Sequence, residues 1–600
     1  LRVVRHPICD SSHFIRHINS RQTTHILAHL QGTQSRHTKA NLAKEPKFSH
    51  STDIPQQDPS DFAKFVRMTK AVNLQPLDNE LPSHFADRLG VLYAKTVTTQ
   101  HKKDNGQFFT PTEIAHFMAR LFKETNGKLK ILDPGCGTAI LSSSLIETAI
   151  LRGDTVKEIE LVVYETDKDI LPYTQATLDY LKKWLQGKKV GFKATLDTND
   201  FVLENKDCFE QGSTLFYEPK NAIYDIVISN PPYFKIGKDD KRAVVAKSIV
   251  WGQPNIYSIF LMTAAKLLKN GGELIFIIPR SFAAGNYFRA FREAFFTEIE
   301  IEQIHLFNSR TDTFNRDNVL QETLILKGKK QKLNGHLTNI LLTHSNGIID
   351  LDQPTEKEYQ ADELIDFNTK EKILHLPSNE TEDKVIKLFK SWNGSLHKYD
   401  MQISTGPVVS FRATEYLYER YENGTKVLVP LYQLINTGKM TFEYPVFKKG
   451  KPQYIQYCEE TKPLLLPNKN YVFLRRFSAK DDKSRLVATP YFVDISQAEF
   501  IGVENHLNYI YRPKGHLARN EILGLAALLN SKLFDTYFRT FNGNINVSAT
   551  ELREIPLPPL EDIKEIGNRI IFTNNFSQSV VDELVNDYFD LEHIFAYEQN

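Results

Sequence analysis

Cysteine is scarce in this sequence, with only four in 600 residues, at positions 9, 136, 208 and 458. They lie far apart and form no Cys-x-x-Cys pair. This argues against a disulfide framework or a cysteine zinc site and is typical of a reducing cytoplasm. No run of about 18 apolar residues occurs, so a membrane-spanning helix is excluded and we expect no membrane association.

The chain also has almost no net charge: 74 Lys and Arg oppose 73 Asp and Glu, giving a formal charge of +1. A nucleic-acid partner would therefore have to be bound by a local cluster of positive side chains. Hydrophobic residues (41%) and charged residues (24%) are at ordinary globular levels, which excludes a largely disordered chain. A chain of 600 residues is longer than a single core usually organises, so we expect two or more domains.

The N-terminal segment has neither a periodic apolar pattern nor the apolar core of a signal peptide. Residues 1–50 carry eight Lys and Arg against two acidic residues, a net charge of eight minus two, or +6. The first of only five methionines is Met68. We expect the native start near Met68, with residues 1–67 a disordered or non-native extension. A DNA-binding arm and loose metal binding by histidines are the alternatives.

Residues from about 107 to 330 alternate between expected strands and helices. Short apolar strands are expected at 128–132, 158–164 and 224–229, and helical patterns follow the first two. Such alternation predicts a parallel sheet with helices on both faces. Ligands of these sheets bind outside the carboxyl ends of the strands, where the strand order reverses.

Short polar motifs follow the expected strands. Asp133-Pro-Gly-Cys-Gly137 follows the first, and Glu165 follows the second, where an acid can accept hydrogen bonds from both hydroxyls of a ribose. Asn199-Asp200-Phe201 offers an acid and an aromatic ring for the amino group and face of an adenine. A glycine pair is often only a tight turn, and a single acid is often a solvated loop residue. Three acids at successive strand ends favour a cofactor site.

The sharpest signal is Asn230-Pro-Pro-Tyr233, directly after the third expected strand. Pro-Pro alone could simply end the strand. Here Asn230 adds a side-chain carbonyl, Pro231 a backbone carbonyl and Tyr233 a flat face. Two acceptors that take both hydrogens of a conjugated amino group would direct its lone pair toward an electrophile, and a stacked ring would orient it. The nearby ribose-and-adenine site implies the methyl group of S-adenosylmethionine as that electrophile.

In this order the motifs resemble those of the gamma-type, adenine-N6 DNA methyltransferases of bacterial restriction–modification systems. Gly106-Gln-Phe-Phe-Thr-Pro111 is similar to the upstream cofactor motif of that family, and residues 272–279 and 314–326 are similar to its later motifs. The resemblance covers residues 106–326. It implies an α/β, Rossmann-like, S-adenosylmethionine-dependent methyltransferase domain. The enzyme would methylate the N6 amino group of a flipped adenine and so protect host DNA.

The resemblance also implies a role for individual residues. For the cofactor it implies Phe108, Thr110 and Pro111 at the methionine side, Asp133, Gly135 and Gly137 in the turn beneath, Glu165 at the ribose, and Asp200 and Phe201 at the adenine. For catalysis it implies Asn230, Pro231, Pro232 and Tyr233, with Phe314 on the other face of the base and Phe307 as the alternative. No metal is implied.

From about residue 380 the alternation gives way to short mixed strands and loops. Basic and aromatic residues interleave in two stretches, which favours DNA contact over a solvated strand face. The residues expected to contact DNA are Arg475, Arg476, Lys480, Lys483, Arg485, Arg512 and Lys514. Residues 544–559 resemble the closing segment of target-recognition domains. We therefore expect a methyltransferase domain at 68–335, a linker at 336–379, an α+β target-recognition domain at 380–575 and a helical tail at 576–600.

Several alternatives remain open at this point. Asn as the first motif residue favours adenine, and a cytosine-N4 enzyme is the alternative. A protein-glutamine methyltransferase uses the same tetrapeptide but resembles only residues 130–280. A bifunctional nuclease–methylase, a modification subunit that needs a specificity subunit, and a DNA-binding protein with an inactive cofactor fold are further possibilities. We expect a monomeric, cytoplasmic bacterial enzyme that acts on double-stranded DNA, and the resemblance allows a separately encoded cognate restriction endonuclease.

Overall fold

The structure is a computed structural model that describes most of the chain after residue 73. The described residues are 74–98, 100–102, 106–209, 222–252, 254–308, 322–331, 338–421, 424, 426–478, 482–543 and 546–595. They belong to one compact unit that begins at Leu74. The extension expected at 1–67, together with Phe314 and Lys480, lies outside the described residues.

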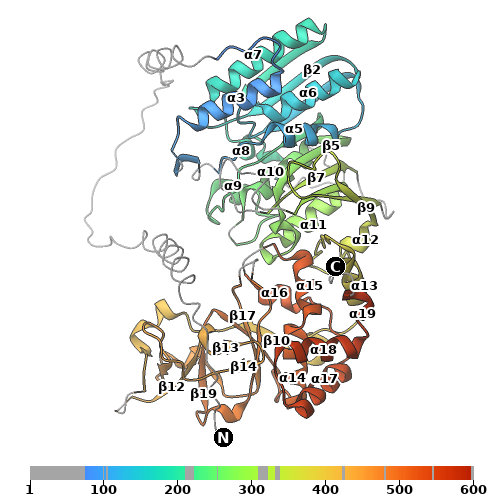
Figure 1. The fold of residues 1–600 in the computed structure, drawn as a ribbon. Coiled ribbons are helices and arrows are strands. Elements are labelled where there is room, and N and C mark those ends of the chain that lie inside the picture. The colour runs from blue at the N-terminus through green and yellow to red at the C-terminus, as the bar shows by residue number, and fades with distance from the viewer. Residues whose placement is uncertain are drawn as a thin grey trace, which may run out of the picture. The chain divides into compact units, whose positions relative to one another are not determined.

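A nine-stranded sheet with the order β3-β2-β1-β4-β5-β7-β6-β8-β9 organises the first half of this unit (Figure 1). Its strands are β1 (Asn126–Pro134), β2 (Thr155–Tyr164), β3 (Gly191–Asp197), β4 (Tyr224–Ser229), β5 (Leu268–Pro279), β6 (Ile299–Phe307), β7 (Thr323–Lys330), β8 (Asn339–Ser345) and β9 (Thr355–Gln360). The first five pair in parallel, and β7 is antiparallel to both β5 and β6. The predicted parallel sheet is confirmed, with an antiparallel strand inserted beside β5.

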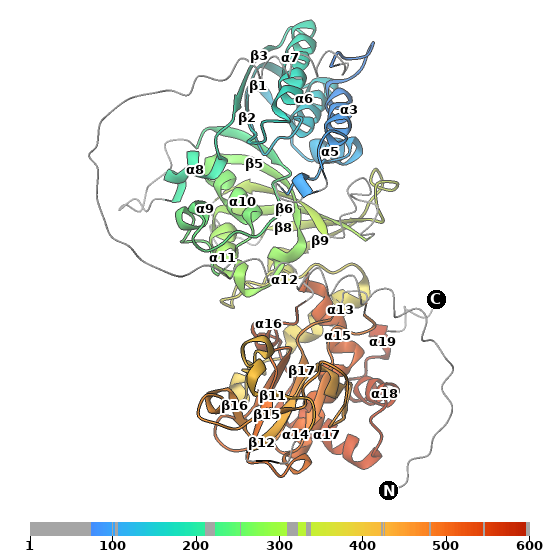
Figure 2. The ribbon, with the colours of Figure 1, turned by 90° about the vertical axis from the view of Figure 1, so that its left-hand side faces the viewer.

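Helices cover both faces of this sheet, as predicted. One group consists of α3 (Pro82–Ala94), α5 (Thr112–Arg120), α6 (Ile140–Arg152) and α7 (Leu171–Gly187), and the other of α8 (Phe201–Glu204), α9 (Lys241–Val245), α10 (Ile256–Leu267) and α11 (Arg289–Glu298). Figure 2 shows the two groups on opposite sides of the strands. Successive residues of β4 alternate between the two cores: Ile226 and Ile228 pack with α5 and α6, and Val227 packs with α10. Burial on both faces explains the continuous apolar strands in the sequence.

Two strands lie within residues 336–379, where a connecting segment was expected. β8 pairs in parallel with β6, and β9 pairs antiparallel to β8, so both extend the sheet. In β9 only Tyr359 is buried, because this strand lies at the edge of the sheet. An edge strand with mostly exposed charged residues carries almost no apolar alternation, which explains why the sequence pattern did not reveal it.

The second half of the unit has the α+β character expected from the sequence. A four-stranded sheet has the order β10-β20-β17-β18, a five-stranded sheet has the order β11-β15-β12-β19-β16, and β13 pairs with β14. The strands are β10 (Gln402–Thr405), β11 (Leu417–Tyr418), β12 (Leu428–Tyr432), β13 (Thr437–Gly438), β14 (Thr441–Phe442), β15 (Tyr454–Gln456), β16 (Leu465–Pro467), β17 (Tyr471–Arg475), β18 (Ala488–Tyr491), β19 (Phe500–Val503) and β20 (Leu507–Tyr511).

Helices pack against these sheets and against one another. They are α13 (Glu380–Ser391), α14 (Arg519–Asn530), α15 (Lys532–Phe541), α16 (Ala549–Arg553), α17 (Leu560–Thr573), α18 (Gln578–Phe589) and α19 (Glu592–Phe595), whereas α12 (Ala361–Leu364) packs beside β9 in the core of the nine-stranded sheet. Val581 and Val585 of α18 are fully buried in the same core as α14 and α17. Residues 578–595, expected as a helical tail, are therefore part of this core. Among the helices of the described residues, none combines the length and the apolar character that crossing a bilayer requires.

The helices α14 and α17 touch through glycines. A Cβ atom on Gly524 would lie 1.8 Å from the carbonyl oxygen of Ile563, and one on Gly567 would lie 1.9 Å from that of Asn520. Both distances are far below a van der Waals contact, so the two backbones approach as closely as they do only because both positions lack a side chain.

Arg280 links the end of β5 to the second half of the unit. Its Nη2 atom donates hydrogen bonds to the carbonyl oxygens of Leu376, Arg539 and Thr540, at 3.2, 3.1 and 2.7 Å. All three acceptors belong to the main chain. The strand next to β4 is thus held directly against the end of α15.

Candidate functional site

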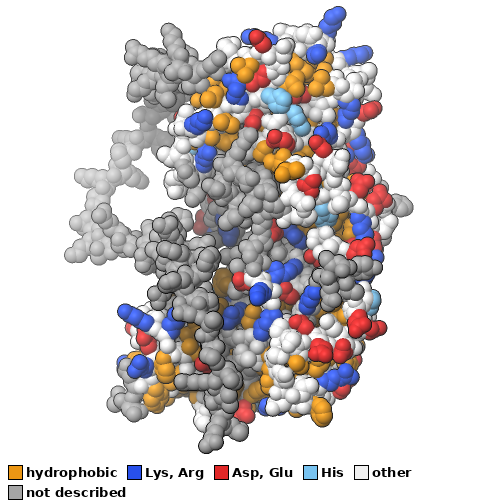
Figure 3. Space-filling model, viewed as in Figure 1, with side chains coloured by type: hydrophobic (Ala, Val, Ile, Leu, Met, Phe, Trp, Pro, Cys, Tyr) orange, Lys and Arg blue, Asp and Glu red, His pale blue; other side chains and the backbone are white. Residues whose placement is uncertain are grey.

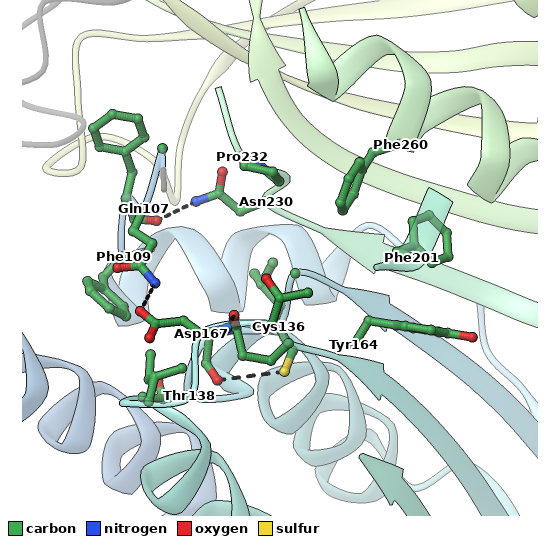
Figure 4. A pocket seen from close by; sticks show the side chains of 18 of the residues that line it. Gln107, Phe109, Cys136, Thr138, Tyr164, Asp167, Phe201, Asn230, Pro232 and Phe260 are labelled. Atoms are coloured by element: carbon green, nitrogen blue, oxygen red, sulfur yellow. Dashed lines mark hydrogen bonds between the residues drawn. The ribbon is translucent and has the colours of Figure 1, made fainter. Parts of the chain in front are cut away.

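A cavity of about 190 Å³ lies at the carboxyl ends of β1, β2 and β4 (Figure 4). The chain runs from β1 outward through β2 and β3, and then returns to the other side of β1 to form β4 and β5. The cavity is therefore at the point where the strand order reverses, which is where ligands of such sheets bind. The predicted residues that line it are Phe108, Thr110, Gly135, Gly137, Glu165, Asp200, Phe201, Asn230 and Pro232.

The turn after β1 forms the floor of the cavity. Gly135 and Gly137 adopt left-handed conformations, with φ of 75° and 55°. A Cβ atom on Gly135 would lie 3.7 Å from both Phe260 and Pro232, so a side chain here would occupy the cavity. The glycines therefore supply both the backbone conformation and the open space that a ligand needs.

Asp133 lies beneath this turn and does not line the cavity. Its side chain is fully buried, and Oδ2 accepts a hydrogen bond from the backbone amide of Ser142 at 3.3 Å. Oδ1 has no hydrogen-bond partner among the described residues. Burial raises the pKa of this carboxyl from an ordinary value of 3.8 to about 7.

Two further predicted acids meet at the cavity from successive strand ends. Glu165 accepts hydrogen bonds from the backbone amides of Gly137 (3.0 Å) and Asp167 (2.9 Å), and burial raises its pKa. Asp200 caps the N-terminus of α8, and its Oδ2 lies 3.6 Å from the guanidinium of Arg242. Both carboxylates are thus fixed by local contacts while still facing the cavity.

The upstream motif orients Asn230. Its Nδ2 donates to the carbonyl oxygen of Phe108 (2.8 Å) and to Oγ1 of Thr110 (3.0 Å). The side-chain carbonyl Oδ1 is therefore directed away from these residues, and it accepts a hydrogen bond from the hydroxyl of Tyr233 at 2.5 Å. Pro111 contributes differently, because it precedes the first residue of α5 and does not line the cavity.

Tyr233, whose flat face is expected to stack on the target base, is largely buried in this structure. The side chain is only 8% exposed, and its hydroxyl also lies within hydrogen-bond distance of the carbonyl oxygen of Ile277, at 2.6 Å. Its ring stacks on Phe108, with centroids 5.7 Å apart. Burial raises the pKa of this hydroxyl well above its usual range. Pro231 is likewise buried, so of the four motif residues Asn230 and Pro232 line the cavity.

Asp167 is a cavity residue that the sequence interpretation missed. It accepts hydrogen bonds from the Tyr93 hydroxyl (2.5 Å), from Nε2 of Gln107 (2.6 Å) and from His101 (2.9 Å). Burial alone would raise its pKa, but these three hydrogen bonds outweigh burial and lower it. Asp167 thereby fastens the upstream motif to the end of β2. Its place two residues after Glu165 was the available signal.

Other lining residues were also missed. They are Phe109, Cys136, Thr138, Tyr164, Thr166, Phe234, Arg242 and Phe260. As a possible metal site, His101, Asp167 and Asp169 have ligand atoms within 4.8 Å of one another. The three hydrogen bonds that Asp167 already accepts fit a polar network better than a metal site. The alternative base-stacking residue, Phe307, ends β6 and is partly exposed.

Of the residues predicted to contact DNA, some have side chains that are hydrogen-bonded within the protein and others have side chains that are exposed to solvent. Arg475 donates to the carbonyl of Thr437, Arg476 to that of Asn505, and Arg512 to the carboxylate of Glu521. Lys483 and Lys514 are exposed. Figure 3 shows positive and negative side chains mixed over the visible face, in keeping with the near-zero net charge.

Arg485 corrects one of these expectations. Its side chain is 1% exposed and donates hydrogen bonds to Ser478 (3.0 Å) and Asn542 (2.9 Å). A guanidinium that is buried and engaged in this way cannot reach a DNA phosphate. The basic pattern around it identified a structural arginine instead.

Comparison with known proteins agrees with this architecture. Residues 155–314 match the Eco57I restriction-modification methylase family. The chain is 32% identical over 527 residues to the type II methyltransferase M.PstI of Providencia stuartii, covering 87% of this chain and 100% of that protein. It is also 32% identical over 474 residues to M.BsuBI of Bacillus subtilis, covering 79% and 91%. It is 27% identical over 201 residues to M.AccI of Acinetobacter calcoaceticus, covering 32% of each.

The family resemblance drawn from the motifs is thus confirmed by similarity that runs far beyond them. The motifs span residues 106–326, whereas the alignment with M.PstI covers 87% of this chain. The chain belongs to the type II DNA methyltransferases of restriction–modification systems.

Proposed function

We propose that this enzyme transfers the methyl group of S-adenosylmethionine to the N6 amino group of an adenine in double-stranded DNA. The observation that carries the proposal is the position of Asn230 at the cavity that Glu165 and Asp200 also face. An amide carbonyl beside a ribose-and-adenine site is what methyl transfer to a conjugated amino group requires.

The cavity residues fit S-adenosylmethionine. The Gly135 turn leaves space that a Cβ would fill, and the Glu165 carboxylate, with two backbone donors, keeps lone pairs for two ribose hydroxyls. Asp200 lies among Phe201, Phe234 and Phe260, a setting suited to an adenine ring. Phe108 and Thr110 would hold the methionine side. When bound, the cofactor supplies an electrophilic methyl group.

The protein's own part in the reaction is to orient the target amino group. Asn230 Oδ1 and the Pro231 carbonyl would accept its two hydrogens, and no strong base is needed because the proton becomes acidic only as the new bond forms. The Tyr233 hydroxyl now donates to Oδ1, but it has a second acceptor in the Ile277 carbonyl. It can therefore release Oδ1 to the substrate without losing a hydrogen bond.

The target base must leave the duplex to reach this cavity, at a cost of a few kcal/mol. Adenine is favoured over cytosine by the asparagine at the first motif position. Identity to type II methyltransferases over most of the chain supports DNA, and not a glutamine side chain, as the substrate.

The test is methylation of unmethylated bacterial genomic DNA with tritiated S-adenosylmethionine, followed by digestion to nucleosides. We expect label in N6-methyladenine from the wild type, none from Asn230→Ala, and wild-type label from Asn393→Ala, a change at an exposed asparagine. Calorimetric titration should show that Asn230→Ala still binds S-adenosylmethionine. Label in N4-methylcytosine would overturn the choice of base, and absence of label in DNA would overturn the proposal.

A further inference from the structure

A lysine-rich hairpin precedes β15. Lys448 and Lys451 pair across an antiparallel bridge, and the amide of Lys451 donates to the carbonyl of Lys448 at 3.0 Å. Gly450 completes the turn with φ of 73°, a value suited to the third position of a type II turn. The turn therefore sets two lysines opposite each other and leaves Lys449 at the tip. All three lysines are exposed.

Aromatic and basic side chains from the neighbouring strand β11 and the loop after it surround this hairpin. The guanidinium of Arg420 lies 5.7 Å from the ring centroid of Phe447, and the rings of Tyr421 and Tyr454 are 5.5 Å apart. Phe447 and Tyr421 are each 57% exposed, so these rings remain accessible beside the lysines. The basic hairpin patch is defined here as Tyr418, Arg420, Tyr421, Lys426, Phe447, Lys448, Lys449, Lys451 and Tyr454.

Four of the five positive charges of the patch have no ion-pair partner among the described residues. Within the part of the chain that the structure describes, Arg420 and the three hairpin lysines form no ion pair. The carboxylate of Glu419 also reaches the hairpin, where it accepts a hydrogen bond from the backbone amide of Gly450 at 2.6 Å. In contrast, Arg475, Arg476 and Arg512 are already committed to carbonyl or carboxylate acceptors inside the protein.

We propose that the basic hairpin patch binds the phosphate backbone of duplex DNA. Like charges directly opposite each other on a hairpin oppose folding, so this arrangement is unfavourable unless a polyanion lies across it. Free lysines can neutralise phosphates, and exposed aromatic rings beside them can contact sugars or bases. The inference rests on the proposed function, because it takes DNA as the substrate. It assigns contact to residues other than those selected by the sequence pattern.

The experiment compares two triple variants with equal changes in charge. One replaces Lys448, Lys449 and Lys451 with Gln, and the control replaces Lys157, Lys182 and Lys183, which are exposed on β2 and α7. Binding of a fluorescein-labelled mixed-sequence duplex is measured by anisotropy between about 50 and 200 mM salt. Each lost phosphate contact reduces the slope of log affinity against log salt concentration by about 0.9. The slope of the hairpin variant should therefore be smaller than that of the wild type by about 2.7.

Over that fourfold range of salt, wild-type affinity should therefore fall about 40-fold more than that of the hairpin variant. The control should keep the wild-type slope. An unchanged slope in the hairpin variant, or an equal fall in both variants, would overturn the inference. Titration with S-adenosylmethionine confirms that each variant is folded. Wild-type methyl transfer to DNA tests the proposed function separately, because it can fail while the hairpin still binds DNA.

Discussion

Replacing Asp133 with Asn should make the stability of the free enzyme less sensitive to pH. The carboxyl group is fully buried beneath the Gly135 turn, where Oδ2 accepts a hydrogen bond from the backbone amide of Ser142 and Oδ1 has no partner among the described residues. Burial raises its pKa from 3.8 to about 7, because burial disfavours the charged form by more than hydrogen bonding with Ser142 stabilises it. The folded protein therefore binds a proton here more tightly than the unfolded chain does.

The direction and size of the effect follow from this difference. The stabilisation by the proton is fully present below pH 3.8 and is lost as pH rises to about 7. Each pKa unit corresponds to about 1.36 kcal/mol of the free energy of unfolding. Ionisation of Asp133 therefore lowers the free energy of unfolding by about 4 kcal/mol over the whole range, and by about 2.7 kcal/mol between pH 5 and pH 8. Asn cannot ionise. The amide nitrogen of Asn, in the place of Oδ1, has no acceptor, which lowers the free energy of unfolding by about 1–3 kcal/mol. This loss is the same at both pH values and so does not affect the comparison.

The assay is urea unfolding of the free enzyme at about pH 5 and pH 8. The stability of Asp133→Asn relative to wild type should rise by about 2.7 kcal/mol between the two. Other buried acids, such as Glu551 with a pKa of about 7, contribute to both proteins and cancel in the comparison. Asp179→Asn, at an exposed position, serves as the control. A relative stability of Asp133→Asn that stays constant between the two pH values would refute the reasoning.

Three further predictions test the site and the core. Glu165→Gln removes the charge available to two hydroxyl donors, so its affinity for S-adenosylmethionine should fall about 10- to 100-fold in calorimetric titration; unchanged affinity would remove this residue from the cofactor site. Tyr233→Phe should lower kcat about fivefold or more while leaving cofactor affinity intact, because the hydroxyl lies within hydrogen-bond distance of both Asn230 Oδ1 and the Ile277 carbonyl and so holds the motif against β5; this is measured in the tritium assay, and equal kcat would contradict it. Gly524→Ala should destabilise the protein by more than about 3 kcal/mol in urea, whereas Gly187→Ala, with no atom within 4 Å of its Cβ, should not.

The central strands and the catalytic motif could be predicted because their signals are local. β4 and the carboxyl-terminal half of β1 are buried on both faces and read as short apolar runs, whereas β2 alternates between buried and more exposed residues. The sharp exit at Asn230-Pro-Pro-Tyr233 is likewise set by neighbouring residues. Strand order then brings Glu165, Asp200 and Asn230 to one edge, as expected for parallel strands.

The features that were missed depend on residues distant in the sequence. Asp167 acquires its role from partners between 60 and 74 residues away, and no local pattern indicates them. Arg485 is buried by Asn542 and by neighbours on other elements, although its surroundings in the sequence are basic. The hydroxyl of Tyr233 meets Ile277, 44 residues away, which a reading of the tetrapeptide alone could not anticipate.

The contacts of Arg280 have a consequence for exchanging recognition parts between such enzymes. The donor in these contacts is one specific side chain, that of Arg280 directly after β5, and the acceptors are main-chain carbonyl oxygens. Main-chain acceptors are the same for every amino acid, so changes of side chain at Leu376, Arg539 and Thr540 leave the three acceptors of Arg280 in place. A transplanted recognition segment therefore keeps the Arg280 hydrogen bonds if it reproduces the backbone at the end of α15, whereas the hydroxyl of Thr540, 2.8 Å from Nδ1 of His375, is a side-chain contact that it must also match.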